Sequence, residues 1–226
     1  MQEFWVYFNL GREHIADLSG YDHILFIVAL CLRYTFADWK KLLVLVTAFT
    51  IGHSITLALS ALNYITISST WIEFLIPVTI VITALSNVWQ KEKAVESKFP
   101  LIYFLALFFG LIHGLGFSNY LKGILGKDEN IVTQLLAFNL GLEAGQLLIV
   151  AAVLIITFAC LQVIKLNRRE YIVLLSGAVF GLALLIALER WPVKKKKRVI
   201  GYSELPGRIN ARPIPKIFHI NKLRII

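Results

Sequence analysis

The residues best suited to chemistry in this sequence are histidines and carboxylates that lie within or beside long apolar stretches. An ionisable side chain inside a lipid bilayer is costly unless it pairs, binds an ion or faces water, so such positions are informative. Four of the five histidines and three acids are placed in this way: His14, Asp22, His23, His53, Glu73, His113 and Glu143. Imidazole and carboxylate together suit a divalent transition metal such as nickel, cobalt or zinc, whereas calcium and magnesium sites are richer in oxygen.

A second polar group lies in the same stretch as Glu143. Asn139, Glu143 and Gln146 follow at spacings of four and three, which places them on one face of a helix where they could continue the site. The alternative is that these groups only join helices, because histidine, asparagine and glutamine often form interhelical hydrogen bonds in membranes. Both interpretations fit the residues alone.

The composition places the chain among membrane proteins. Of its 226 residues, 58% are hydrophobic and only 16% are charged, which is unusual for a soluble domain. We predict an all-α fold, a polytopic membrane helix bundle with about six transmembrane helices, over residues 1–193, followed by a tail over residues 194–226. Cys31 and Cys160 both lie in apolar stretches, so a disulfide framework is not expected.

Apolar runs of about 20 residues are long enough to cross the roughly 30 Å hydrocarbon core of a bilayer. Six stretches separated by short polar joints are predicted to cross: 21–36, 42–62, 71–89, 100–119, 132–161 and 171–191. Residues 1–19 mix aromatic and charged side chains, which suits an interfacial N-terminal segment rather than a span.

Glycines mark two of the predicted spans. Gly110, Gly114 and Gly116 flank His113 and predict that a neighbouring helix approaches closely. The fifth span is too long for one straight crossing, and Gly141 and Gly145 lie within it. We expect a tilt, a kink or an interfacial first turn to absorb the excess length.

The lysines and arginines of the short joints predict the orientation, because cationic loops are retained in the cytoplasm. Nine lie in the joints after the first, third and fifth spans: Arg33, Lys40, Lys41, Lys91, Lys93, Lys98, Lys165, Arg168 and Arg169. Three lie in the amino-terminal segment and the opposite joints: Arg12, Lys122 and Lys127. We therefore predict a bacterial inner membrane protein with its amino terminus outside. Six spans would also place the basic tail outside, unless one span is a re-entrant hairpin.

The depths of the ionisable residues predict one shared pocket. At a rise of about 1.5 Å per residue, His53 and His113 lie roughly 17 and 20 Å from the inner ends of their spans. Glu143 lies roughly 17 Å from the outer end of its span, and His23 and Glu73 lie near the outer ends of theirs. We expect the site in the middle or outer part of the membrane, open to the outer face.

Four spaced segments contain most of these residues. They read HIADLSGYDH over 14–23, AFTIGHSITLAL from Ala48, FGLIHGLGFS from Phe109 and FNLGLEAGQ from Phe138. In this order and spacing the chain resembles the HupE/UreJ family of hydrogenase and urease accessory membrane proteins. The resemblance covers most of residues 8–191.

The HupE/UreJ family is regarded as secondary nickel or cobalt permeases, and the resemblance implies that role here. Its polar motif residues fall on these positions: His14, Asp22, His23, His53, Glu73, His113 and Glu143. The chain departs from the family pattern before Asp22, where it keeps Gly20 but lacks the proline that the family tends to have.

The residues leave three functions open. A divalent-metal permease would use the histidines and carboxylates to strip part of the ion's hydration shell, and this function is favoured over a metalloenzyme. An intramembrane zinc-dependent hydrolase would hold zinc on three of these ligands, with a carboxylate such as Glu143 as general base. A non-catalytic subunit of a larger membrane complex would dock through the tail.

The tail carries all of the net charge of +9. Residues 194–226 contain ten lysines and arginines against the single acid Glu204. The basic run 194–198 follows the last span directly, so anionic membrane lipids are a better match than nucleic acid. Pro206, Pro213 and Pro215 argue against a long helix. We expect the tail to become ordered against lipid headgroups or a protein partner.

Truncation after Val193 tests the role of the tail. We expect the shortened protein to insert, fold and keep its metal site, while its association with anionic vesicles or a partner weakens, because the cations are lost. Size-exclusion chromatography, metal analysis and vesicle co-sedimentation measure these properties. A truncated protein that failed to insert or lost its metal would place the tail in the core fold.

Overall fold

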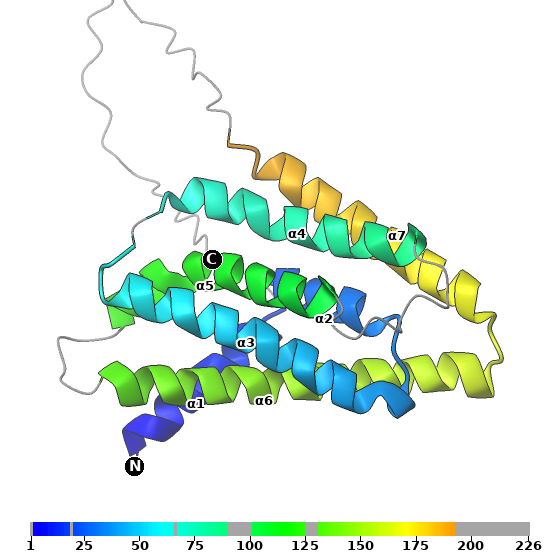
Figure 1. Cartoon of the computed structure of the whole chain (residues 1–226), viewed down its shortest axis with the longest axis horizontal. Helices are drawn as coiled ribbons and strands as arrows, with labels where there is room; N and C mark the ends of the chain where they lie inside the picture. Colours follow the sequence, from blue (N-terminus) through cyan, green and yellow to red (C-terminus); the bar gives the residue numbers. More distant parts are fainter. Residues whose placement is uncertain (1, 19, 66, 90–100, 125–130, 193–226) are drawn as a thin grey trace, which may run out of the picture. The chain divides into compact units, whose positions relative to one another are not determined.

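The structure is a computed structural model that describes residues 2–18, 20–65, 67–89, 101–124 and 131–192, and the regular elements in these ranges are all helical. In chain order they are α1 (Gln2–Ala16), α2 (Asp22–Cys31), the short 3-10 helix η1 (Phe36–Asp38), α3 (Trp39–Ala61), α4 (Ser69–Trp89), α5 (Leu101–Ile124), α6 (Ile131–Phe158), the π-helical turn η2 (Ala159–Val163) and α7 (Arg168–Glu189) (Figure 1). The predicted all-α fold is confirmed for this part of the chain. The predictions for Lys91, Lys93, Lys98, Lys127, the side chain of Lys122 and the tail lie outside the described residues.

In the part of the chain that the structure describes, four helical segments are long and apolar enough to cross a membrane. They are Phe36–Ala61, Ser69–Trp89, Ile131–Val163 and Arg168–Glu189. The first and fourth predicted spans correspond to the shorter apolar helices Asp22–Cys31 and Ile102–Ser118. Length and composition of the described helices therefore support four spans and do not confirm the predicted six.

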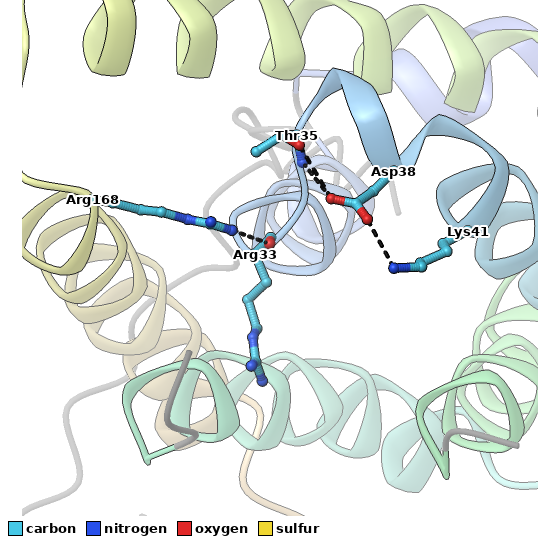
Figure 2. A network of polar contacts seen from close by, with 5 residues as sticks. All are labelled: Arg33, Thr35, Asp38, Lys41 and Arg168. Atoms are coloured by element: carbon cyan, nitrogen blue, oxygen red, sulfur yellow. Dashed lines mark hydrogen bonds and ion pairs between the residues drawn. The ribbon is translucent and has the colours of Figure 1, made fainter. Parts of the chain in front are cut away.

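The first predicted span, 21–36, is interrupted by the start of the next helix. Helix α2 has ten residues, so its length of about 15 Å covers half of a bilayer core. Beyond it, the backbone N–H and the hydroxyl of Thr35 both donate to Asp38 Oδ2, over 3.3 and 3.1 Å (Figure 2). Lys41 Nζ lies 2.9 Å from the other oxygen of Asp38. These contacts fix the start of η1 and α3, so the helical run cannot continue to residue 36.

Helices α1 and α6 pack at backbone distance through glycines. A methyl group at Gly11 would lie 2.0 Å from the carbonyl oxygen of Phe138, and one at Gly141 would lie 1.8 Å from that of Phe8. Gly145 follows one turn later beside Ile15. Contacts that advance together along both helices show that α1 and α6 run in the same chain direction. The glycines of α6 therefore pack against α1, and the irregular turn of this long segment comes later, at η2.

Helices α3 and α5 form a second parallel pair, which also packs through glycines. Methyl groups at Gly52 and Gly110 would each lie 2.1 Å from a carbonyl oxygen of the facing helix, those of Leu107 and Phe49. One at Gly114 would lie 2.4 Å from the carbonyl oxygen of His53. The prediction that Gly110 and Gly114 allow close helix approach is confirmed.

Helices α4 and α7 form a third, antiparallel pair. The rings of Phe74, near the start of α4, and Trp191, beyond the end of α7, have centroids 5.0 Å apart. At the other end, the Arg169 guanidinium donates to the backbone carbonyls of Asn87 and Val88. Next to it, Arg168 Nη2 donates to the Arg33 carbonyl over 2.8 Å (Figure 2). The carboxy-terminal end of α4 thus lies at the same end of the bundle as Arg33 and Arg168.

Helix α2 packs among these pairs. The ring of Phe26 lies 5.1 Å from that of Phe49 in α3 and 5.8 Å from that of Phe109 in α5, between centroids. Asn87 of α4 donates from Nδ2 to the Ala29 carbonyl over 2.7 Å. These contacts of α2 reach helices from different pairs, and they fix the position of α2 in the bundle.

Substitution of Gly110 by alanine tests the backbone contact. We expect Gly110→Ala to cost about 1–3 kcal/mol, because the added methyl group would force α3 and α5 apart. The matched control is Gly177→Ala in α7, where a Cβ would meet no atom within 4 Å and helix propensity favours alanine by up to about 1 kcal/mol. Thermal unfolding in detergent measures both. Equal shifts for the two variants would contradict close packing at Gly110.

Candidate functional site

The break between α1 and α2 brings the first two histidines together. His14 lies in the last turn of α1 and His23 in the first turn of α2. The turn between the two helices keeps both of them in the bundle. The two ring centroids are 4.7 Å apart, and the rings are nearly edge to face. This juxtaposition depends on the end of α1 at Ala16, which the sequence pattern did not indicate.

The close pair of α3 and α5 supplies the other two histidines. Gly110, one turn before His113, and Gly114, directly after it, sit against the backbone of His53, so the two histidines are held at similar heights. The centroid of the His53 ring lies 6.2 Å from that of His14, and the His113 ring lies 5.1 Å from that of His23. Four helices thus contribute one imidazole each to a single group, the histidine cluster.

Three rings of the histidine cluster are buried, His14 is half-buried, and most of the ring nitrogens lack hydrogen-bond partners. His53, His113 and His23 are 0%, 1% and 8% exposed. Within the described residues, no partner is present for Nε2 of His14 and His23, for either nitrogen of His53, or for Nδ1 of His113. An unsatisfied buried polar group costs about 1–3 kcal/mol. The cluster is therefore a destabilising feature of the fold unless another species supplies the missing contacts.

A threonine that sequence reasoning missed sets the orientation of His113. The Thr79 hydroxyl donates to the Ile76 carbonyl over 2.7 Å and lies 3.4 Å from His113 Nε2. A hydroxyl has one hydrogen to donate, so it can only accept from the imidazole. Nε2 of His113 then carries the proton and Nδ1 carries the lone pair. That lone pair belongs to the buried nitrogen without a partner, and a neutral imidazole nitrogen is the form that binds metals.

Aromatic rings surround the histidine cluster. The Phe117 ring lies 3.8 Å from that of His14, and the Phe49 ring lies 5.2 Å from that of His113, between centroids. Phe138 stacks on His53 at 6.3 Å. Such walls exclude water, and four imidazolium cations at these separations would repel one another. The sequence could have indicated these walls, because the aromatic residues lie in the same segments as the histidines.

Asp22 lies beside the cluster and already has a cationic partner. Its side chain is 11% exposed, and Oδ2 lies 2.7 Å from Nη1 of Arg190, the residue that caps the end of α7. Sequence analysis did not predict this ion pair, because the two residues lie at opposite ends of the chain.

Glu143 faces α3 at a different level. Its Oε1 accepts a hydrogen bond from the Thr47 hydroxyl over 2.7 Å, and Gln146 Oε1 accepts one from the Thr50 hydroxyl over 2.8 Å. Thr47 lies about 9 Å from His53 along α3 at a rise of 1.5 Å per residue. For these two members of the predicted polar stripe, the contacts are interhelical hydrogen bonds.

Asn139 and Glu73 complete the predicted set. The Asn139 side chain lies beside His53, although its buried amide oxygen makes no well-aligned hydrogen bond among the described residues. Its Nδ2 donates to the Leu135 carbonyl over 2.8 Å. Glu73 is half-buried near the start of α4 and has no hydrogen bond or ion pair within the described residues. The structure does not connect Glu73 to the histidine cluster.

The geometry stops short of a complete coordination shell. A histidine nitrogen binds a metal such as zinc at about 2.0–2.1 Å, so two rings that share an ion have centroids roughly 5–6 Å apart. The rings of His14 and His113 have centroids 4.7 and 5.1 Å from that of His23, which is close enough for each pair to share an ion. In the described part of the chain, however, no three His, Cys, Asp or Glu side chains are arranged so that they could hold a metal ion.

Apolar helices of membrane length around buried histidines define a polytopic helical protein of membrane type. The family model described as HupE / UreJ protein matches residues 1–194. The chain therefore belongs to the HupE/UreJ family, and the resemblance carried by the four sequence segments is confirmed. Comparison with curated proteins and with solved structures gives no match.

Replacement of His53 tests the energetic cost of the cluster. We expect His53→Leu to leave the metal-free protein as stable as the wild type or up to about 3 kcal/mol more stable, because two unsatisfied nitrogens are removed. The control is Asn87→Leu, which removes a formed hydrogen bond to Ala29 and should cost about 1 kcal/mol. Thermal unfolding with a chelator present measures both. Equal losses would show that His53 stabilises the fold.

Proposed function

We propose that this protein is a permease for a divalent transition metal, with nickel or cobalt as the cargo and the histidine cluster as its binding site in the membrane. The observation that carries the proposal is the convergence of four imidazoles from α1, α2, α3 and α5, three of them buried, with five ring nitrogens that have no partner among the described residues. Membership of the HupE/UreJ family supports it.

The arrangement of α1 and α2 supports a crossing made of two half-helices. Gln134 near the start of α6 donates to Glu3 near the start of α1, and Gly145 further along α6 contacts Ile15 near the end of α1. From there α2 continues toward the end where Arg33 meets Arg168. Together α1 and α2 replace one continuous span. With helix α5 as a further crossing, the bundle would cross six times, with the amino terminus outside a bacterial inner membrane.

The break between two half-helices is where transporters place their cargo, because an interrupted helix brings polar groups to mid-membrane depth. Here the break lies beside Gly145, which is about 21 Å into α6 at 1.5 Å per residue. His14 and His23 flank it directly. An ion bound there would be well separated from both membrane surfaces.

The ligand chemistry fits a cargo that binds and leaves. Neutral imidazole nitrogens suit nickel, cobalt and zinc, and rotation of the rings would let two or more nitrogens face one ion. An incomplete ligand set gives a weaker, exchangeable site, whereas a zinc enzyme needs three fixed ligands. Glu143, the predicted general base of a hydrolase, is instead bonded to Thr47 at another level. These observations favour the permease over the hydrolase.

Uptake by proteoliposomes tests the proposed function. We expect wild-type protein to accumulate cobalt or nickel, and a His23→Ala, His53→Ala double variant to do so at least about tenfold more slowly, because metal sites lose that much affinity even when only supporting contacts are removed. His219→Ala, in the tail, is the matched control and should transport normally. Equal uptake by wild type and the double variant would refute the permease.

A further inference from the structure

Arg190 and Asp22 form an ion pair at the edge of the histidine cluster. Nη1 of Arg190 lies 2.7 Å from Oδ2 of Asp22, at the junction of the end of α7 and the start of α2. The side chain of Asp22 is 11% exposed and that of Arg190 is 36% exposed. The carboxylate is therefore enclosed, while the guanidinium has access to its surroundings.

Asp22 lies next to the histidine cluster, so a cation bound to its carboxylate affects metal binding there. It immediately precedes His23, whose ring lies between those of His14 and His113 in the cluster. A dication held only by neutral imidazoles has no counter-charge, so an adjacent carboxylate would contribute strongly to its binding. Asp22 is the acid whose chain position and burial put it beside the rings. A guanidinium keeps its charge under all relevant conditions, so it competes for the same carboxylate.

We propose that Arg190 is a tethered cation that occupies Asp22 when no ion is bound and must swing away before a divalent metal can use that carboxylate. This inference rests on the proposed function of the cluster. In the ion-free state Arg190 neutralises an enclosed negative charge, which would otherwise be costly. In the loaded state the displaced guanidinium moves toward the exposed side. Arg190 thus lowers metal affinity and helps the cargo to leave.

A purely structural role predicts the opposite sign. If Arg190 only fastened α7 to α2, its removal would loosen the first turn of α2 and weaken binding at His23. If it competes with the metal, its removal frees Asp22 and tightens binding, since apparent affinity scales with the fraction of competent protein. The direction of the change in affinity therefore separates the two roles.

Cobalt binding to the purified full-length protein in detergent, measured by equilibrium dialysis, tests the proposal. We expect Arg190→Gln to bind cobalt about tenfold more tightly than wild type, which corresponds to removal of one competing charged hydrogen bond. The matched control is Arg168→Gln at the other end of α7, where the guanidinium donates to a backbone carbonyl of Arg33. Its affinity should equal that of wild type.

Two further variants secure the interpretation. Asp22→Asn should weaken binding, and adding Arg190→Gln to it should give no gain, because coupled residues are not additive. Arg190→Lys retains a cation and should lie between wild type and Arg190→Gln, which keeps the test available if the glutamine variant does not fold. Binding by Arg190→Gln or Arg190→Lys that is unchanged or weaker than in wild type would overturn the competitor role. Failure of wild type and all variants to bind cobalt would overturn the proposed function itself.

Discussion

The backbone contact between α3 and α5 is the constraint on which the histidine cluster depends. Gly110 lies one turn before His113, Gly114 directly follows it, and both pack against the backbone of His53. A side chain at either glycine would separate the helices and with them the two imidazoles. The contact between α1 and α6 positions His14 in a similar way, because Gly11, Gly141 and Gly145 set how closely α1 approaches α6.

This packing has an energetic consequence. It encloses imidazole nitrogens that lack partners within the described residues, next to aromatic rings that offer no hydrogen bonds. Several neighbouring polar side chains, by contrast, have hydrogen-bond partners. Thr50 bonds Gln146, and Asn87 bonds the Ala29 carbonyl. The amide oxygens of Gln134 and Asn139, like five imidazole nitrogens of the histidine cluster, have no partner among the described residues. This cost favours a role for the histidines other than stability.

Several features of the site were not accessible from periodicity and composition. Thr79 and Arg190 contact His113 and Asp22 across separate helices, and no pattern along the chain pairs residues so distant. Glu143 was expected with the histidines on depth alone, yet it bonds Thr47 because its side chain leaves α6 toward a different level of α3. The expected first span of 21–36 ends at Cys31, because Thr35 and Asp38 begin a new helix.

The sequence by itself determined the all-α class, the family, the histidines as a set and the glycines that allow close approach, because these follow from residue types and local spacing. It also grouped Arg33 with Arg168 at one end of the bundle through a charge count. Only the tertiary structure decided which helices pair, where α1 ends and α2 begins, and which nitrogens stay without partners. Those outcomes depend on contacts between residues far apart in the chain, whose energies arise only when the helices are packed.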